Sequence, residues 1–479
     1  MEKEFDIVTY TEGKNTSHSQ KELQSNDLKY FKSLCDSIRR ILDEKEGNET
    51  VKDEALNRHN RALLGNKTEV KYYINKIQQL LEERRLSNSW FPTWYKSLPE
   101  AIYHEGYGYA GFANWMDDDG EFSESPTCKI IGNNIFYEVD GVPLVQEQTI
   151  DKERFEKLRT TLLNAEPRKL KSEPYHEIYS SDGKRITIYH ESGMTKLGQS
   201  TIVIRRYLTN VSSFKEQAER HTIPHEAIPL FHSMIKCGFN VVFIGPVKSG
   251  KTTILTVWQS CEDPLMEGLQ IETDPEMPMH IIMPKSPIMQ LVPTSKYMSK
   301  VITTAKRSDA QYIVLGEARD GNMMNIAVEA ANMGTRRCKV TGHFSDPVDF
   351  SFDVADKITR SCGGDLGCNM IKVAKSFQYI FDFFSLPRDR GQKRLKGIWE
   401  MRYNPEEMKI TMHQICRYRI IEDDWVWSYD VGLDKEQIGI EEDHIALQKF
   451  KKELKILSEQ YPNTAKHIFE PAYLKIWRK

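Results

Sequence analysis

The chain has 479 residues, of which 28% are charged and 39% hydrophobic, and its net charge is -3. This length exceeds what one hydrophobic core supports, so two to four domains are expected. No run approaches the roughly 20 apolar residues of a membrane span. The balance of 66 basic and 69 acidic residues argues against a globally basic nucleic-acid binder, although a local basic groove stays open. The polar first six residues are unlike a secretory signal, and we expect a cytoplasmic protein with reduced thiols.

Residues 1–100 predict a polar arm followed by a helical extension. Residues 1–27 contain few apolar side chains, which favours a loose arm. Apolar side chains then recur three and four residues apart from Leu34 to Leu42 and again from Val70 to Leu81, which predicts two helices. Each apolar stripe is expected to pack within its own subdomain rather than against a partner.

Residues 101–215 predict a separate α+β domain made of short strands and turns. The strand candidates are Lys129–Ile131, Asn134–Val139, Arg185–Tyr189 and Ser200–Tyr207. The pair Asp140-Gly141 indicates a turn that joins a hairpin or meander. The polar segment 211–224 ends in a proline, which favours a hinge before the next domain.

Residues 216–430 are expected to form one domain, within which residues 225–385 alternate strand-like and helix-like runs, and residues 431–479 predict a helical tail. The strand candidates are Asn240–Ile244, Leu269–Glu272, His280–Met283, Gln311–Leu315 and Cys338–Thr341. Such alternation predicts an α/β fold with a mostly parallel sheet, and ligands bind at the carboxyl ends of its strands. In the tail, apolar side chains recur at helical spacing from Leu447 to Tyr461. We expect them to dock on the chain's own body rather than to form a coiled coil.

The segment Gly245–Thr252 reads G-x-x-x-x-G-K-T, the pattern of a phosphate-binding loop. A buried-strand-like run precedes it, and a run that can open a helix follows. This order aims backbone N–H groups and the positive end of a helix dipole at one point. Lys251 is then expected to reach the β- and γ-phosphates of ATP, and the Thr252 hydroxyl to ligate Mg²⁺.

Hydrolysis of ATP also needs an oriented water and groups that stabilise charge on the γ-phosphoryl oxygens. An apolar run delivers Glu317 at its end, where a carboxylate holds a Mg²⁺-bound water or polarises the attacking one. Glu272, Asp274 and Glu276 follow a second strand, and His343 ends a further strand, where it can contact a γ-phosphate. The alternatives are a solvated strand end, an ordinary acidic turn and a structural histidine.

Four landmarks stand in one order: GPVKSGKTT, IETDPE, YIVLGEARD and VTGH. This order resembles the hexameric traffic ATPases of type II and type IV secretion systems, type IV pili, tight-adherence pili and conjugation machines. The segments DGKR, TIVIRRY and DRGQKRLKGIWEM are similar to further stretches of that family, so the resemblance spans roughly residues 125–415. It implies a RecA-like P-loop ATPase domain with a smaller α+β domain before it.

The resemblance also implies roles for single residues. The nucleotide would be held by Gly245, Lys248, Ser249, Gly250, Lys251, Thr252 and Thr253, with Thr252 and Glu317 at the Mg²⁺. The catalytic set would be Glu272, Glu276, Glu317, His343, Arg205 and Arg185. Of these, the two arginines would act as arginine fingers supplied by the N-terminal domain. Lys248 replaces a glycine of the family's loop, which we expect to be tolerated if its φ stays negative.

As a member of such a family, the protein would be an ATPase that forms a homo-oligomeric ring, expected to be a hexamer, at the inner face of the cell membrane. It would power secretion, conjugation or pilus assembly together with inner-membrane components. The chain lacks the tetracysteine zinc element of the type II and pilus-extension branch, so the conjugation and tight-adherence branch is the closer match. Two alternatives stay open: a RecA-like nucleic-acid translocase or helicase, and a nucleotide-binding scaffold without turnover.

Overall fold

The computed structural model describes most of the chain, in twelve segments. They are residues 18–45, 57–59, 61–62, 66–165, 173–179, 184–206, 213–273, 275–293, 297, 300–301, 309–332 and 336–471. The chain divides into two compact units, residues 1–208 and 209–479. Residues 1–17 of the expected arm lie outside the described residues. The loose-arm prediction is wrong for residues 18–27, because helix α2 already begins at His18. Once a helix is nucleated, extending it by further turns costs little.

The first unit contains the helices α2 (His18–Lys45), α4 (Lys67–Glu83), α5 (Leu98–Gly106), α6 (Ala113–Met116) and α7 (Lys152–Ala165). Of these, α2 and α4 contain the two predicted apolar stripes. Asn66 ends the charged stretch between α2 and α4, and its side chain accepts hydrogen bonds from the backbone N–H groups of Thr68 and Glu69. This cap satisfies two of the donors that a helix start leaves unpaired.

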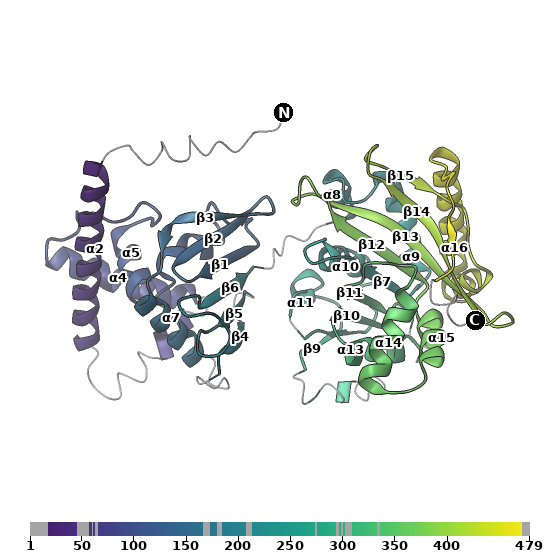
Figure 1. Cartoon of the computed structure of the whole chain (residues 1–479), viewed down its shortest axis with the longest axis horizontal. Helices are drawn as coiled ribbons and strands as arrows, with labels where there is room; N and C mark the ends of the chain where they lie inside the picture. The colour runs from purple at the N-terminus through teal and green to yellow at the C-terminus, as the bar shows by residue number, and fades with distance from the viewer. Residues whose placement is uncertain are drawn as a thin grey trace. The chain divides into compact units, whose positions relative to one another are not determined.

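A six-stranded antiparallel sheet completes this unit, in the order β3-β2-β1-β6-β5-β4 (Figure 1). The strands are β1 (Thr127–Ile131), β2 (Asn134–Val139), β3 (Val142–Thr149), β4 (Tyr175–Tyr179), β5 (Arg185–Tyr189) and β6 (Thr201–Arg205). The predicted turn between β2 and β3 is confirmed, since Asp140 and Gly141 have φ values of 50° and 78°. Two positive φ values in succession are what a two-residue hairpin turn requires.

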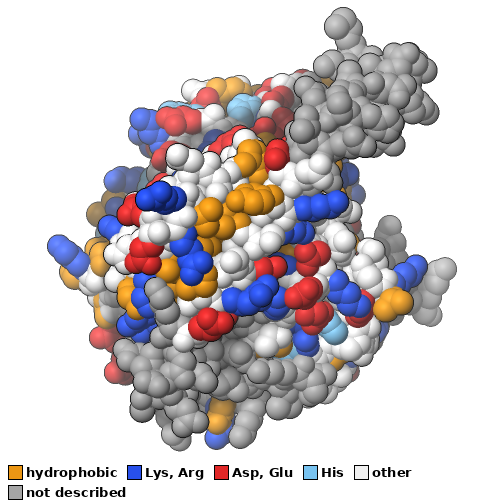
Figure 2. All heavy atoms as spheres, turned by 90° about the vertical axis from the view of Figure 1, so that its left-hand side faces the viewer, with side chains coloured by type: hydrophobic (Ala, Val, Ile, Leu, Met, Phe, Trp, Pro, Cys, Tyr) orange, Lys and Arg blue, Asp and Glu red, His pale blue; other side chains and the backbone are white. Residues whose placement is uncertain are grey.

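The helices and the sheet of this unit share one core. Phe31 and Ile38 of α2, Ile77 of α4, and Ile130 and Ile204 of the sheet belong to the same cluster of buried side chains. The apolar stripes therefore pack within the chain, as predicted. Figure 2 shows Lys and Arg interspersed with Asp and Glu on the face that it draws, around a band of hydrophobic side chains.

The second unit is built on a ten-stranded mixed sheet, whose main path runs β15-β14-β13-β12-β7-β11-β10-β8-β9. The strands are β7 (Val241–Ile244), β8 (Gly268–Ile271), β9 (Ile288–Leu291), β10 (Tyr312–Ala318), β11 (Lys339–Gly342), β12 (Tyr379–Ser385), β13 (Lys393–Asn404), β14 (Lys409–Arg419), β15 (Asp424–Trp427) and β16 (Ile468–Phe469). Along the path from β12 to β9, each strand is parallel to the next one, which confirms the predicted α/β core. The sheet then continues antiparallel through β13, β14 and β15.

One local prediction is wrong, and the hinge expected at residues 211–224 stays a prediction. The candidate strand His280–Met283 is instead helix α11 (Met279–Ile282), which begins after Pro278. A four-residue apolar run fits either period, so its neighbours in space decide its form. The segment expected as a hinge contains helix α8 (Phe214–Glu219), whose start carries a capping box between Ser213 and Glu216.

Helices cover both faces of this sheet (Figure 1). They are α9 (Ile228–Lys236), α10 (Lys251–Ser260), α13 (Gly321–Ala331), α14 (Phe350–Cys362), α15 (Leu366–Ser376) and α16 (Leu433–Gln460). Successive residues of β7 point to opposite faces, so Val241 and Phe243 join the core under α9, α10 and α16, and Val242 and Ile244 join the core under α13, α14 and α15.

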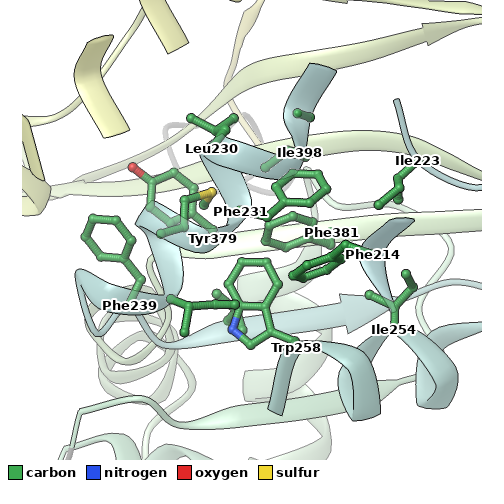
Figure 3. Close-up of a cluster of buried hydrophobic side chains, with 14 of the residues drawn as sticks. Phe214, Ile223, Leu230, Phe231, Phe239, Ile254, Trp258, Tyr379, Phe381 and Ile398 are labelled. Atoms are coloured by element: carbon green, nitrogen blue, oxygen red, sulfur yellow. The ribbon is translucent and has the colours of Figure 1, made fainter. Parts of the chain in front are cut away.

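Aromatic side chains fill the first of these two cores (Figure 3). Phe231, Trp258 and Phe381 lie together there, with ring centroids of Trp258 and Phe381 5.1 Å apart. The tail helix α16 adds five buried side chains to this core, namely Ala446, Leu447, Phe450, Leu454 and Leu457. The docking predicted for the tail is thus confirmed, although Tyr461 is 40% exposed.

Candidate active site

The carboxyl ends of four neighbouring parallel strands carry all four landmarks of the sequence. The phosphate-loop pattern follows β7, His343 follows β11, Glu317 lies near the end of β10 and Glu272 follows β8. These strands are adjacent in the order β7-β11-β10-β8. Parallel strands end at the same edge of a sheet, so residues 27 to 98 positions after Gly245 meet the loop there.

The loop after β7 needs glycine at two of its positions. Gly245 has φ 139°, and a Cβ there would lie 2.0 Å from the carbonyl oxygen of Phe383. Gly250 has φ 89° and precedes helix α10. Between them, Lys248 has φ 64°, so the condition under which its side chain was expected to be tolerated is not met. The chain must reverse between the buried Gly245 and the buried Ser249, and this reversal places Lys248 in the left-handed region that favours glycine.

Ser249 provides a test of whether the loop fits a phosphate group. Its side chain is fully buried, and among the described residues no group forms a hydrogen bond with its hydroxyl oxygen. Buried hydroxyl groups normally have a partner. This one lies immediately before the N-terminus of α10, where backbone N–H groups and the helix dipole attract anions. The residues present therefore fit a bound phosphate.

Lys251 is the cation at the centre of the site. Its Nζ donates to the carbonyl oxygen of Pro246 at 2.7 Å and lies 3.4 Å from Nδ1 of His343. Burial lowers the pKa of Lys251 to about 8, against the opposing effect of the nearby Glu317 and Glu276 carboxylates. A bound phosphate would supply the negative charge that burial makes this ammonium group need.

Glu317 is held from two sides. Its Oε1 lies 2.5 Å from Nε2 of His343, and its Oε2 accepts from Arg319, whose Nη2 is 2.6 Å away. Burial alone would raise the pKa of Glu317, but the hydrogen bonds from His343 and Arg319 lower it to about 2. Nδ1 of His343 lies 3.2 Å from the carbonyl oxygen of Gly245, so the imidazole bridges the loop and the glutamate. The ionised glutamate is thus fixed beside Lys251.

The acidic turn after β8 contains two glutamates that have different hydrogen-bond partners. Glu272 is 3% exposed, and its Oε1 accepts from the backbone N–H groups of Glu276 at 3.0 Å and Met277 at 3.1 Å. Burial raises the pKa of Glu272 to about 7. Glu276 faces the loop, since its Oε2 accepts from the Thr252 hydroxyl at 3.2 Å. Asp274, between them, lies outside the described residues.

The remaining predicted loop residues differ in their burial. Lys248 and Thr253 are exposed. Thr252, the predicted Mg²⁺ ligand, donates its hydroxyl hydrogen to Glu276, and the lone pairs of its oxygen stay available for a cation. Among the described residues, no group of three or more His, Cys, Asp and Glu side chains is arranged to hold a metal by itself.

Arg185 and Arg205 belong to the first unit and lie directly opposite each other on β5 and β6. Side chains at such opposed positions share one face of the sheet. Nη2 of Arg185 forms an ion pair with Oε1 of Glu177 at 3.2 Å. Their role as arginine fingers stays a prediction.

The neighbouring Arg206 differs in kind from these two. It is buried over the Trp115 ring at 4.4 Å and donates to four backbone carbonyl oxygens, those of Trp115, Asp117, Phe122 and Ser123. Its contacts are structural, since they hold the segment from Trp115 to Ser123 against β6.

Sequence patterns alone missed two residues of the site. Arg319 was visible only as part of the quoted YIVLGEARD stretch, and its bond to Glu317 becomes evident in the structure. Gln270 had no signal beyond its place in a strand, yet its Nε2 donates to Oε2 of Glu272 at 2.5 Å.

Fold and site together define a RecA-like protein with a P-loop, in which one strand separates the loop strand from the strand that carries Glu317. No family model and no curated protein matches the sequence. Among the described residues, no helix is both long and apolar enough to cross a membrane.

Several solved structures are similar to this chain. One is the VirB11 ATPase of the Brucella suis type IV secretion system, at a TM-score of 0.32 and 15% identity over 60% of this chain and 92% of that one. The pilus retraction motor PilT with bound ADP has a TM-score of 0.42 and 14% identity over 74% and 89%. The ATPase DotB of Yersinia pseudotuberculosis has a TM-score of 0.43 and 17% identity over 71% and 83%. The first of these is an ATPase of a type IV secretion system, the second a pilus retraction motor and the third an ATPase.

Proposed function

We propose that the protein binds ATP with Mg²⁺ at this site and hydrolyses it. The single observation that carries the proposal is the unsatisfied, fully buried hydroxyl of Ser249 beside the start of α10. The surrounding groups suit the chemistry, because Lys251 supplies positive charge and the His343–Glu317 pair stands next to it. Mg²⁺ between the phosphates would neutralise negative charge that develops during phosphoryl transfer.

The three glutamates suit different tasks in this scheme. Glu317, with a pKa of about 2, is a carboxylate at neutral pH and a weak base, so it is suited to orienting the attacking water. Glu272, with a pKa of about 7, is better matched to accepting a proton, but its buried carboxylate already holds the backbone of the turn. We therefore assign Glu272 to shaping the turn, Glu276 to the Thr252 side of the site, and Glu317 to the water.

We further propose that ATP turnover drives a homo-oligomeric ring, expected to be a hexamer, that serves a secretion, conjugation or pilus machine. The order of the motifs and the absence of a tetracysteine element support this proposal and its conjugation or tight-adherence branch. Arg185 and Arg205 would then complete the site as arginine fingers. A cation that arrives only in a closed arrangement couples hydrolysis to motion. Such a ring would work in the cytoplasm against inner-membrane components.

Two substitutions test the site itself. Lys251→Ala should abolish binding of a fluorescent ATP analogue, because the buried cation is lost. Glu317→Gln should keep binding and stop phosphate release, because a neutral amide cannot polarise water in the same way. The exposed Lys215→Ala and Glu219→Gln on α8 are the matched controls, and they should behave like the wild type. Normal phosphate release by Glu317→Gln would contradict the assigned role of this residue.

The same assays separate the alternatives. Clear ATP binding without any phosphate release would favour a nucleotide-binding scaffold, an alternative that the left-handed Lys248 in the loop keeps in view. Stimulation of turnover by single-stranded DNA with a steep salt dependence would favour a nucleic-acid translocase. Mass photometry with and without ATP tests the ring, since a nucleotide-stabilised hexamer is expected.

A further inference from the structure

A pair of glutamine side chains lies behind the acidic turn. Gln270 of β8 is 1% exposed, and its Nε2 donates both to Oε2 of Glu272 at 2.5 Å and to the carbonyl oxygen of Met277 at 2.8 Å. Its Oε1 accepts from Nε2 of Gln290 at 2.7 Å. Both amide hydrogens and the carbonyl oxygen of Gln270 are therefore used, which defines one orientation of the amide group.

The sheet explains why these side chains meet. Gln270 and Glu272 are two residues apart along the chain from β8, so they project on the same side. Gln270 and Gln290 are partners in the parallel pairing of β8 with β9. Gln290 in turn contacts Nδ1 of His280 on α11 through its Oε1, at 2.9 Å. A continuous polar relay thus runs from the exposed His280 to the buried Glu272.

The relay continues to the phosphate loop on the other side of Glu272. Oε1 of Glu272 holds the backbone N–H of Glu276, and the Glu276 carboxylate accepts from the Thr252 hydroxyl. The wall behind Glu272 is tight, since a Cβ at Gly316 would lie 2.8 Å from its Cγ. Glu272 thus has little room to rotate, and Gln270 supplies the only side-chain hydrogen bond that it is recorded to receive among the described residues.

We propose that Gln270, oriented by Gln290, is a positioning residue for ATP hydrolysis: it fixes the Glu272 carboxylate and, through the acidic turn, the approach of Glu276 to Thr252. This inference rests on the proposed function of the site. Gln270 touches neither the loop nor a reacting atom, and it acts only through Glu272. Its two donated hydrogen bonds distinguish it from a residue that merely fills space.

The proposal has a signature in the pH dependence of turnover. Burial raises the pKa of Glu272, the nearby Glu276 carboxylate adds to this, and the hydrogen bond from Gln270 opposes it. From α11, His280 contacts Gln290, and β10 presents the uncharged Gly316. Removing the Gln270 donor should therefore move the pH at which Glu272 ionises upward.

The test uses the full chain with Gln270→Leu, which removes both donated hydrogen bonds at similar volume. ATP affinity should stay within about twofold, because no phosphate-binding group is touched. Turnover should fall roughly tenfold, the loss expected for a hydrogen bond to a charged group. The acidic limb of the kcat–pH profile should move to higher pH. Gln437→Leu on α16, an exposed glutamine, is the matched control and should match the wild type. An unchanged kcat and pH profile in Gln270→Leu would overturn the proposal.

Two further variants test the same positioning role of Gln270. Gln290→Leu, on the less buried strand β9, should shift turnover and the pH profile in the same direction but less, and it serves where Gln270→Leu does not fold. Gln270→Asn keeps the amide group at a shorter reach and should recover part of the lost turnover. If neither prediction holds, Gln270 is a structural core residue only.

A measurement without nucleotide separates this proposal from the proposed function. The pH dependence of thermal unfolding should differ between the wild type and Gln270→Leu, and the difference should vanish when both carry Glu272→Gln. If the wild-type protein releases no phosphate, ATP hydrolysis fails as its function, while this cycle still reports whether Gln270 controls Glu272. Identical pH dependences with and without Gln270 would refute the positioning role in either case.

Discussion

Lys248 holds a backbone conformation that L-residues avoid, and its replacement by glycine gives a quantitative test of the loop geometry. Its φ is 64°, and its carbonyl oxygen accepts a hydrogen bond from the Ser385 hydroxyl at 3.2 Å. Because that bond uses a backbone atom, Lys248→Gly should preserve it. The substitution removes the steric conflict of the side chain and, at the same time, one positive charge at the edge of the phosphate site.

The magnitude follows from two opposing effects. A left-handed conformation costs an L-residue about 1–2 kcal/mol, and glycine loses about 0.4–1 kcal/mol more in conformational entropy on folding. The net expectation for Lys248→Gly is a stabilisation of about 0.5–1 kcal/mol, which raises the melting temperature of a unit of this size by roughly 1–4 °C. Loss of an exposed cation should weaken ATP binding by at most about fivefold.

Scanning calorimetry without nucleotide measures the first effect, and titration with a fluorescent ATP analogue measures the second. Lys248→Ala is the control that separates them, since it loses the charge but keeps the conflict with a positive φ. Its melting temperature should not rise, and its ATP affinity should match that of Lys248→Gly. Equal melting temperatures for the glycine and alanine variants would refute the left-handed geometry of the loop.

Three further predictions concern other parts of the chain. The stability of the wild-type protein should fall as the pH rises from about 4.5 through 7, because the carboxyl group of Glu272 has a pKa of about 7 in the folded protein and is protonated there more readily than in the unfolded chain. Glu272→Gln should flatten this pH dependence in thermal melts. Arg337→Met should lower the free energy of unfolding, measured in urea, by roughly 3 kcal/mol, because it removes the ion pair between Nη1 of Arg337 and Oε2 of the buried Glu262, which are 2.7 Å apart. Arg205→Ala should slow phosphate release at nearly unchanged ATP affinity, and wild-type turnover would exclude an arginine finger.

The sequence predicted the mostly parallel sheet and the close approach of the phosphate loop, the glutamates and His343, because both follow from local signals. An apolar strand followed by a glycine loop is visible along the chain, and strand alternation places every carboxyl end at one edge. The parallel strands β9 and β12 and the antiparallel strands β13, β14 and β15 were missed. The runs of the antiparallel strands mix charged and apolar residues, and their pairing partners are not apparent from spacing. The short run from His280 to Met283 fits both helix and strand, so only its surroundings assign it.

The contacts between side chains of the site were harder to predict from the sequence than the positions of its residues in the fold. Glu317 and His343 were recognised from their positions after strands, but their mutual contact depends on the insertion of β11 between β7 and β10. The φ of Lys248 depends on which neighbours are buried, which no pattern of residue types reveals. Gln270 carries no motif, and its importance emerges only when β9 is placed beside β8.

The seating of α16 has a practical consequence for deletion experiments. Phe450 and Leu454 of this helix are fully buried in the same core as Trp258 of α10, and Glu442 pairs with Arg337 at 2.8 Å. A protein shortened before this helix would expose the apolar side chains of this core, next to the candidate active site. Loss of activity after such trimming would therefore report damage to the core that supports the candidate active site, and it could not be taken as evidence that the C-terminus recruits another molecule.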